Sequence, residues 1–112
     1  MNLKDKVIYV TGASLGIGYE IASELLKQDA KVVITARNKE NLDKAKNTLS
    51  KISNNVQAHA FDISDENELK KSMNNVYDHF GKIDGLVNNA PSIHPGMIKD
   101  MSLSQWKTNF KA

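Results

Sequence analysis

A regular alternation of short β-branched runs with longer segments of helical periodicity constrains the fold of this chain most. Val7–Val10 (VIYV) is typical of a strand buried on both faces, because its apolar residues are consecutive, and Lys31–Ala36 (KVVITA) is a second β-branched run. Strands separated by helices of about 10 to 15 residues indicate βαβ units and a parallel sheet with right-handed crossovers. We therefore expect an α/β fold with strands at 7–10, 31–36, 56–61 and 83–87.

Capping residues mark the intervening helices. The first helix begins near Gly16, and Asn38 is a candidate N-cap for the second. The third follows the Asp-Ile-Ser-Asp segment at 62–65, which predicts its cap, and stops at Gly81. Apolar residues at helical spacing predict the buried face of each helix. For the second helix these are Leu42, Ala45, Leu49 and Ile52.

Composition narrows the class of protein. With 112 residues, 40% hydrophobic and 25% charged, the chain is typical of one soluble globular domain, which we place at 1–112. The absence of cysteine excludes disulfide scaffolds and suits a cytoplasmic protein, and the three histidines lack metal-ligand spacing, so no metal site is expected. The 15 basic and 13 acidic residues form no basic block, so neither nucleic acid nor a membrane is an expected partner. Short apolar runs predict no membrane span, and no signal-peptide pattern opens the chain.

The segment Thr11–Gly18 (TGASLGIG) lies where the first predicted strand passes into the first helix. A helix N-terminus presents unpaired N–H groups and about half a positive charge, and glycines there let a diphosphate approach the backbone. The Gly-x3-Gly-x-Gly spacing departs from the common G-x-G-x-x-G, and the segment lacks the Gly-Lys-Ser/Thr of a P-loop. The residues alone predict a phosphate-bearing ligand, and a turn that binds nothing is the alternative.

Three successive motifs of the chain resemble those of the short-chain dehydrogenase/reductase family. The family signature TGxxxGIG reads Thr11–Gly18 here, its acidic and small apolar pair reads Asp62-Ile63, and its Asn-Asn-Ala-Gly run reads Asn88-Asn89-Ala90-Pro91. All three follow predicted strands, and open α/β sheets bind ligands at the carboxyl ends of their strands. The resemblance implies a Rossmann-like three-layer α/β/α fold with a parallel sheet of strand order 3-2-1-4, truncated after the fourth strand and the start of its following helix.

The resemblance also implies a role for each matched residue. The glycine turn would hold the diphosphate and place Ile17 beside the nicotinamide ribose. Asp62 would accept a hydrogen bond from the adenine amino group while Ile63 packs on the ring; without the resemblance, Asp62 is typical of a helix cap. The expected cofactor-binding residues are Gly12, Ser14, Leu15, Gly16, Ile17, Gly18, Arg37, Asn38, Asp62, Ile63, Asn89 and Ala90.

The asparagine run carries two further implied roles. Asn88 would stabilise the central strands, and Asn89 and Ala90 would line the cofactor ribose, although paired asparagines are also typical of turns. Pro91 departs from the family pattern, because it replaces glycine with a ring and removes an N–H group.

The end of the second strand favours NADP over NAD. An acidic residue there would bind the adenosine ribose diol and repel a 2′-phosphate, but the chain has Ala36 and then Arg37. The planar guanidinium of Arg37 suits phosphate, with Ser14 and Asn38 as polar neighbours. NADP-preferring relatives have a basic residue inside the turn, at the position that Leu15 occupies here, so NAD stays possible. A solvated arginine is the alternative interpretation of Arg37.

The resemblance implies catalysis by a tyrosine and a lysine four residues later, because a neighbouring cation lowers the phenol pKa from about 10. No such pair is present, and no catalytic residue is assigned. At that spacing Tyr9 is followed by Ala13, Tyr19 by Ser23 and Tyr77 by Gly81.

We therefore expect an NADP(H)-binding N-terminal portion of an oxidoreductase that interconverts a carbonyl and a secondary alcohol by hydride transfer. The small-molecule substrate would need a C-terminal half with the missing tyrosine. A non-catalytic dinucleotide-binding or assembly module, or an inactive gene remnant, is the alternative. A final helix is expected from a capping box at 102–105 with Trp106 and Phe110, and self-association is expected through the open edge of the fourth strand.

Overall fold

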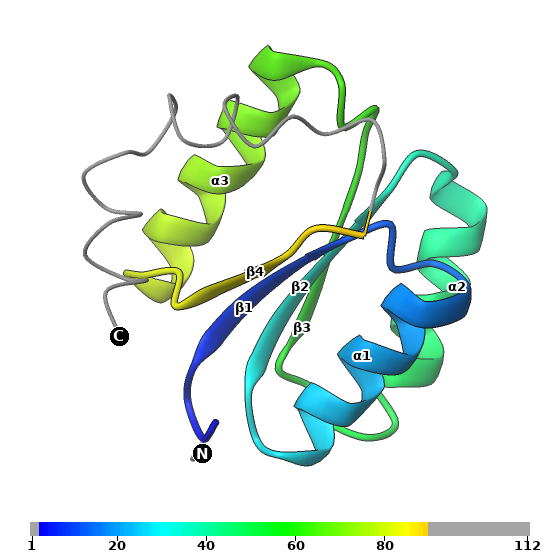
Figure 1. Ribbon diagram of the computed structural model, residues 1–112, viewed down its shortest axis with the longest axis vertical. Coiled ribbons are helices and arrows are strands. Elements are labelled where there is room, and N and C mark those ends of the chain that lie inside the picture. Colours follow the sequence, from blue (N-terminus) through cyan, green and yellow to red (C-terminus); the bar gives the residue numbers. More distant parts are fainter. Residues whose placement is uncertain (1–2, 90–112) are drawn as a thin grey trace.

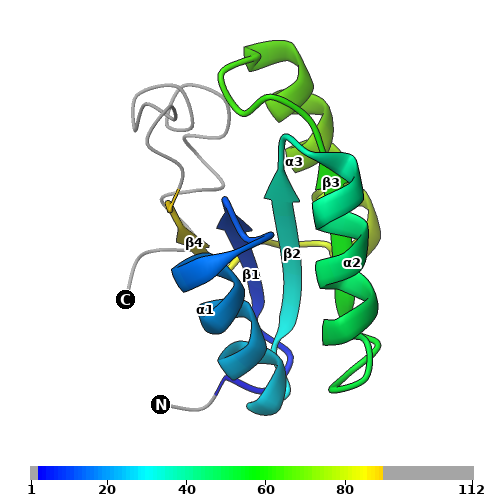
Figure 2. The ribbon, with the colours of Figure 1, turned by 90° about the vertical axis from the view of Figure 1, so that its right-hand side faces the viewer.

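The computed structural model describes residues 3–89 and contains one parallel sheet with strand order β3-β2-β1-β4 (Figure 1). Figure 2 shows β1 and β2 side by side and pointing the same way. The predicted α/β class, parallel sheet and 3-2-1-4 order are confirmed. The strands are β1 (Val7–Thr11), β2 (Lys31–Ala36), β3 (Val56–Ala60) and β4 (Gly85–Val87), and the helices are α1 (Gly16–Lys27), α2 (Lys39–Leu49) and α3 (Glu66–Phe80).

The helices form two layers around the sheet. In Figure 1, α1 and α2 cover one face of the sheet and α3 covers the other. Alternate residues of β1 divide between the faces: Ile8 and Val10 pack with α1 and α2, whereas Val7 and Tyr9 pack with α3. Every residue of β1 is buried, as expected of a central strand covered on both sides.

Local capping chemistry agrees with the predicted helix boundaries. Asn38 caps α2 by accepting a 2.9 Å hydrogen bond from the Asn41 N–H, and Asp65 caps α3 by accepting from the N–H groups of Asn67 and Glu68. Gly81 ends α3 at a φ of +80°, which glycine adopts without a Cβ penalty.

Two sequence expectations need correction. The buried face of α2 ends at Leu49, and Ile52 lies beyond the helix with 39% of its surface exposed, because Ser50 and the turn after it end the helical periodicity. The fourth strand begins at Gly85 rather than Ile83; Ile83 is buried beside α3, and the Asp84 N–H donates to the Val7 carbonyl before the ladder starts. The predicted helix after 101 and the residues Trp106 and Phe110 lie outside the described residues.

Candidate functional site

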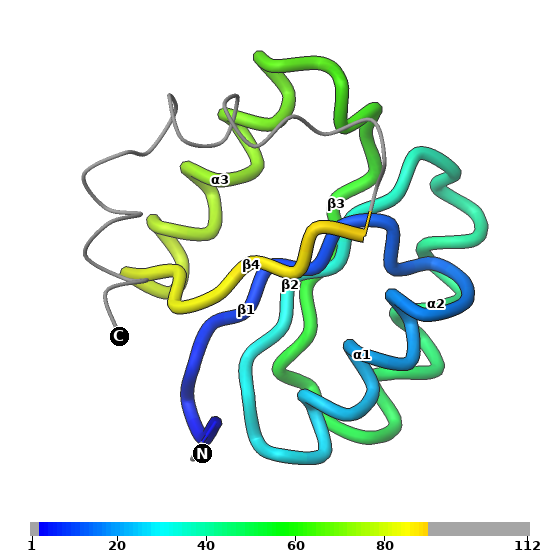
Figure 3. Tube along the Cα trace, in the orientation of Figure 1, coloured from blue at the N-terminus to red at the C-terminus, as the bar shows by residue number. Residues whose placement is uncertain are grey.

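The segments that leave the strands meet at the carboxyl edge of the parallel sheet. Figure 3 shows the chain after β1 lying beside the end of β4 at this edge. Residues 12–18 follow β1, Arg37 and Asn38 follow β2, 61–65 follow β3, and Asn88 and Asn89 follow β4. The three motifs found in the sequence are thereby brought to one edge, which is where open α/β sheets bind ligands.

Left-handed backbone conformations and tight packing at Gly18 hold the glycine turn, residues 12–18, in place. Gly12 and Gly16 adopt φ values of +64° and +65°, in the left-handed region that favours glycine. Gly18 has no space for a side chain: a Cβ there would lie 2.4 Å from the Gly12 carbonyl oxygen and 2.9 Å from Asn89 Nδ2. The first turn of α1 therefore packs directly against the end of β1.

Asn89 and Thr11 tie the glycine turn to β4. The Asn89 side chain donates from Nδ2 to the Gly12 carbonyl at 3.1 Å, and its backbone N–H donates to Thr11 Oγ1 at 2.9 Å. Thr11 is fully buried, and its hydroxyl lies 3.4 Å from both the Val87 carbonyl oxygen and Asn88 Oδ1. Sequence reasoning gave Thr11 no role, although it opens the motif, because only the fold brings residues 11 and 89 together.

Within the described residues, the N-terminus of α1 has neither a side-chain cap nor an acidic neighbour in its first turn. Its N-cap residue is Leu15, which makes no side-chain capping hydrogen bond. The N–H groups and the positive end of the helix dipole could therefore accept an anion. Leu15 and Ile17 flank this end with 70% and 71% of their surfaces exposed, so apolar surface lies beside the helix N-terminus.

Arg37 and Asp62 form a second, exposed region, called the rim below. Arg37 Nη2 lies 3.9 Å from Asp62 Oδ2, and the two side chains are 77% and 46% exposed. Asp62 Oδ1 also accepts from the Ser64 hydroxyl at 2.7 Å and the Ser64 N–H at 3.0 Å. These Ser64 hydrogen bonds, assisted by the Arg37 charge, lower the pKa of Asp62 below its usual range. The rim therefore pairs a permanent cation with a carboxylate that stays ionised.

The remaining predicted residues lie in varied settings. The Asn38 Oδ1 is used to cap α2. Ile63 is only 5% exposed and packs with Leu69 and Met73 of the α3 layer, so its contact with an adenine ring stays a prediction. Ala90 and Pro91 lie outside the described residues.

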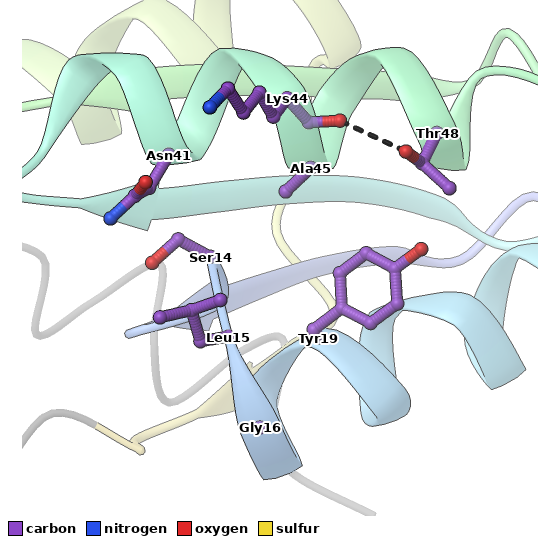
Figure 4. A pocket seen from close by; sticks show the side chains of 8 residues that line it. All are labelled: Ser14, Leu15, Gly16, Tyr19, Asn41, Lys44, Ala45 and Thr48. Carbon is purple, nitrogen blue, oxygen red and sulfur yellow. Dashed lines mark hydrogen bonds between the residues drawn. The ribbon is translucent and has the colours of Figure 1, made fainter.

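A cleft of about 270 Å³ lies between α1 and α2 beside the glycine turn. Figure 4 shows that the turn forms one wall and α2 the other. It is lined by Ser14, Leu15, Gly16, Tyr19, Asn41, Lys44, Ala45 and Thr48.

Tyr9 packs in the core between the sheet and α3. It is fully buried in the α3 layer, its hydroxyl lies 2.6 Å from Ser72 Oγ, and burial raises its pKa well above the ordinary value. His59 Nδ1 lies 2.6 Å from the same Ser72 oxygen, and burial lowers the pKa of His59. This chain of contacts joins β1, α3 and β3 away from the glycine turn. Among the described residues there is no cluster of metal-ligand side chains, and no described helix is long and apolar enough to cross a membrane.

Comparison with known proteins identifies the family. Residues 6–112 match the short chain dehydrogenase family. This chain belongs to that family. It is 37% identical over 106 residues to an uncharacterized oxidoreductase of Staphylococcus epidermidis, covering 95% of this chain and 45% of the relative. It is 39% identical over 90 residues to an 11-beta-hydroxysteroid dehydrogenase-like protein of Arabidopsis thaliana, covering 80% and 29%. The chain therefore spans less than half the length of these relatives.

Solved structures of the short-chain dehydrogenase family agree in fold. A metagenomic short-chain oxidoreductase in complex with NADP superposes with a TM-score of 0.74 at 37% identity, covering 80% of this chain and 41% of that one. An NAD+-bound xylitol dehydrogenase superposes with a TM-score of 0.76 at 30% identity, covering 80% and 35%. The predicted family and its Rossmann-like fold are confirmed, and these two structures differ in the cofactor that they carry.

Proposed function

We propose that this chain is the NADP(H)-binding portion of an oxidoreductase that interconverts a carbonyl and a secondary alcohol. The observation that carries the proposal is the glycine turn at the carboxyl edge of the sheet. There the contact of Gly18 with Gly12 excludes any side chain, and Asn89, which follows β4, holds the turn by a hydrogen bond. A backbone that approaches this closely, next to an open helix N-terminus, fits a diphosphate. When bound, the nicotinamide supplies or accepts the hydride.

The chain's own residues bind and orient the dinucleotide. The N–H groups of the glycine turn and the first turn of α1 face the diphosphate, while the exposed Leu15 and Ile17 offer apolar contacts to the parts of the cofactor beside it. Asp62, ionised at neutral pH, accepts from the adenine amino group, and Asn89 lines the cofactor ribose. A proton donor to the developing alkoxide is not assigned in this sequence, because its three tyrosines lack a lysine four residues later.

The rim supports NADP(H) over NAD(H). A residue that binds the ribose diol and repels a 2′-phosphate would be acidic at the end of β2, where this chain has Ala36. Arg37 follows it with an exposed guanidinium that suits a phosphate, and specificity between two cofactors needs both the attraction and the absence of the repulsive group.

Calorimetric titration of the full chain with NADPH and NADH tests the proposal. We expect both cofactors to bind, because they share the glycine turn, and NADPH to bind more tightly. Equal affinities would reject the cofactor preference, and binding of neither cofactor would reject the function.

A non-catalytic dinucleotide-binding module is the second candidate, since none of the tyrosines in residues 1–112 is followed by a lysine four positions later. The NADPH absorbance, followed with a panel of aldehydes, ketones and 3-oxoacyl thioesters, separates the two. The polypeptide of residues 1–112 is expected to give no turnover above the protein-free rate, whereas a longer protein with a downstream Tyr-x-x-x-Lys segment should reduce a carbonyl.

A further inference from the structure

The cleft between α1 and α2 joins the glycine turn to a lysine that the proposed function does not yet use. It is lined by Ser14 and Leu15 from the turn and by Asn41 and Lys44 from α2. In Figure 4, the Ser14 hydroxyl and the Asn41 amide both point toward the N-terminal end of α2. The cleft is therefore polar at the end that lies next to the rim.

Within residues 3–89, Lys44 has no acidic partner at ion-pair distance, in contrast to Lys39 of the same helix. Lys39 pairs with Asp43 at 2.9 Å, and Lys70 with Glu66 at 3.5 Å. Figure 4 shows the Lys44 side chain running back along α2 toward its N-terminal end, the direction that helical side chains ordinarily take. Its ammonium is thus directed toward the end of the helix that Arg37 precedes.

The distance along the helix is compatible with two cations acting on one ligand. Lys44 is six residues after the cap Asn38, which corresponds to about 9 Å of helix rise, and the backward lean of a long side chain shortens the gap. Lys44 and Arg37 can therefore both reach a ligand at the start of α2.

The rim gives a reason for a second cation. Asp62 lies 3.9 Å from the Arg37 guanidinium and is ionised, so it offsets part of the positive charge that a phosphate dianion would meet there. Leu15 contributes no charge from the turn. A second cation, on the α2 side, would restore the positive charge that Asp62 offsets.

We propose that Lys44, with Asn41 and Ser14 beside it in the cleft, is a second specificity determinant that binds the 2′-phosphate of NADP(H) from the α2 side. The inference rests on the proposed function and extends it to Asn41 and Lys44, which lie outside the three sequence motifs. The polar mouth of the cleft, formed by Ser14, Asn41 and Lys44, then takes the phosphate that Arg37 holds on the other side.

Charge removal on one helix, with a matched control, tests this assignment. Lys44→Ala and Lys46→Ala remove the same charge from α2, but Lys46 does not line the cleft. Each full-chain variant is titrated with NADPH and NADH, and with 2′,5′-ADP and 5′-AMP as fragments that differ in the 2′-phosphate. We expect Lys44→Ala to weaken NADPH and 2′,5′-ADP by about three- to ten-fold, to leave NADH and 5′-AMP within about two-fold, and to lower the salt dependence of NADPH binding. Lys44→Arg should retain most of the NADPH affinity.

The outcomes separate this inference from the proposed function. If the wild-type chain binds NADPH but Lys44→Ala behaves like Lys46→Ala, the role of Lys44 is overturned and the proposed function stands. If Lys44→Ala weakens NADPH and NADH equally, Lys44 acts on the turn and not on the phosphate, which also overturns it. Binding of neither cofactor by the wild type overturns both. Circular dichroism and thermal unfolding of each variant confirm that an affinity change reflects a folded protein.

Discussion

The glycine turn and the rim lie at the same edge of the sheet but are held in different ways. The turn is fixed by a glycine without space for a Cβ, by two left-handed glycines and by hydrogen bonds from Asn89 to Gly12 and Thr11. The rim consists of two exposed side chains whose charged atoms lie 3.9 Å apart. Backbone packing therefore holds the glycine turn, whereas the rim consists of a solvent-exposed ion pair.

This difference matches what each region would recognise. A diphosphate is common to both nicotinamide cofactors, so the region that binds it can be held rigidly by backbone packing. The 2′-phosphate is the single group that distinguishes NADP from NAD, and an exposed arginine can be exchanged with little cost to folding. We therefore expect changes in the turn to affect both cofactors and the fold, and changes in the rim to affect one cofactor only.

The largest effect is expected from Gly18→Ala. The added Cβ would lie 2.4 Å from a backbone carbonyl, so the turn or α1 must move. We expect the free energy of unfolding to fall by about 1–3 kcal/mol and the affinity for NADPH and NADH to fall together by about a hundred-fold or more. Chemical denaturation and calorimetry measure the two effects.

Gly85→Ala is the matched control for that substitution. Its Cβ would also approach closely, at 2.8 Å, but to the Cδ1 atom of the Ile8 side chain, which can rotate. We expect a smaller loss of stability and unchanged cofactor affinity. Equal effects from the two variants would show that tight packing in general, and not the turn, sets the affinity.

Arg37→Ala should give the next largest effect, confined to one cofactor. A charge-assisted hydrogen bond contributes about 1.5–3 kcal/mol, so NADPH binding should weaken by roughly ten- to a hundred-fold while NADH binding changes little. Unfolding free energy should stay within about 0.5 kcal/mol, because the side chain is exposed. An equal loss for both cofactors would contradict the assignment of the 2′-phosphate to the rim.

Sequence reasoning predicted the parts of the molecule that depend on local chemistry. The periodicity located every described helix and strand. The N-cap Asn38, a cap within the segment 62–65 and the stop at Gly81 were confirmed, because capping uses residues a few positions apart. The family resemblance supplied the strand order, which local patterns alone leave open.

Sequence reasoning missed the contacts that join distant segments. Gly18 and Asn89 are 71 positions apart, so the close approach that explains this glycine depends on the sheet order. The contact of Arg37 with Asp62 needs β2 beside β3, and the burial of Ile63 depends on α3 folding over it. The fold also brings together Tyr9, Ser72 and His59, which no motif connects.

Asn89→Ala should disturb the glycine turn less than Gly18→Ala. It removes the 3.1 Å hydrogen bond to the Gly12 carbonyl without adding an atom. We expect stability to fall by about 1 kcal/mol and both cofactors to bind about five-fold more weakly, since the turn loses a restraint that each cofactor uses. Asn54→Ala, at an exposed position near the opposite edge of the sheet, is the control and should change neither quantity.

The smallest effect expected is a pH dependence that belongs to the rim alone. A phosphate monoester has a second pKa near 6, so the 2′-phosphate loses one negative charge as the pH falls through that value, whereas the diphosphate keeps its charge. Asp62 stays ionised because its Ser64 hydrogen bonds hold its pKa low, so the rim itself does not change. Lowering the pH from about 7.5 to about 5.5 should weaken NADP+ binding by about two- to four-fold and leave NAD+ binding unchanged. A parallel fall for NAD+ would instead indicate that a protein group gains a proton on acidification. Measuring the same profile in His59→Gln would test whether that group is His59, which lies beside Ser72.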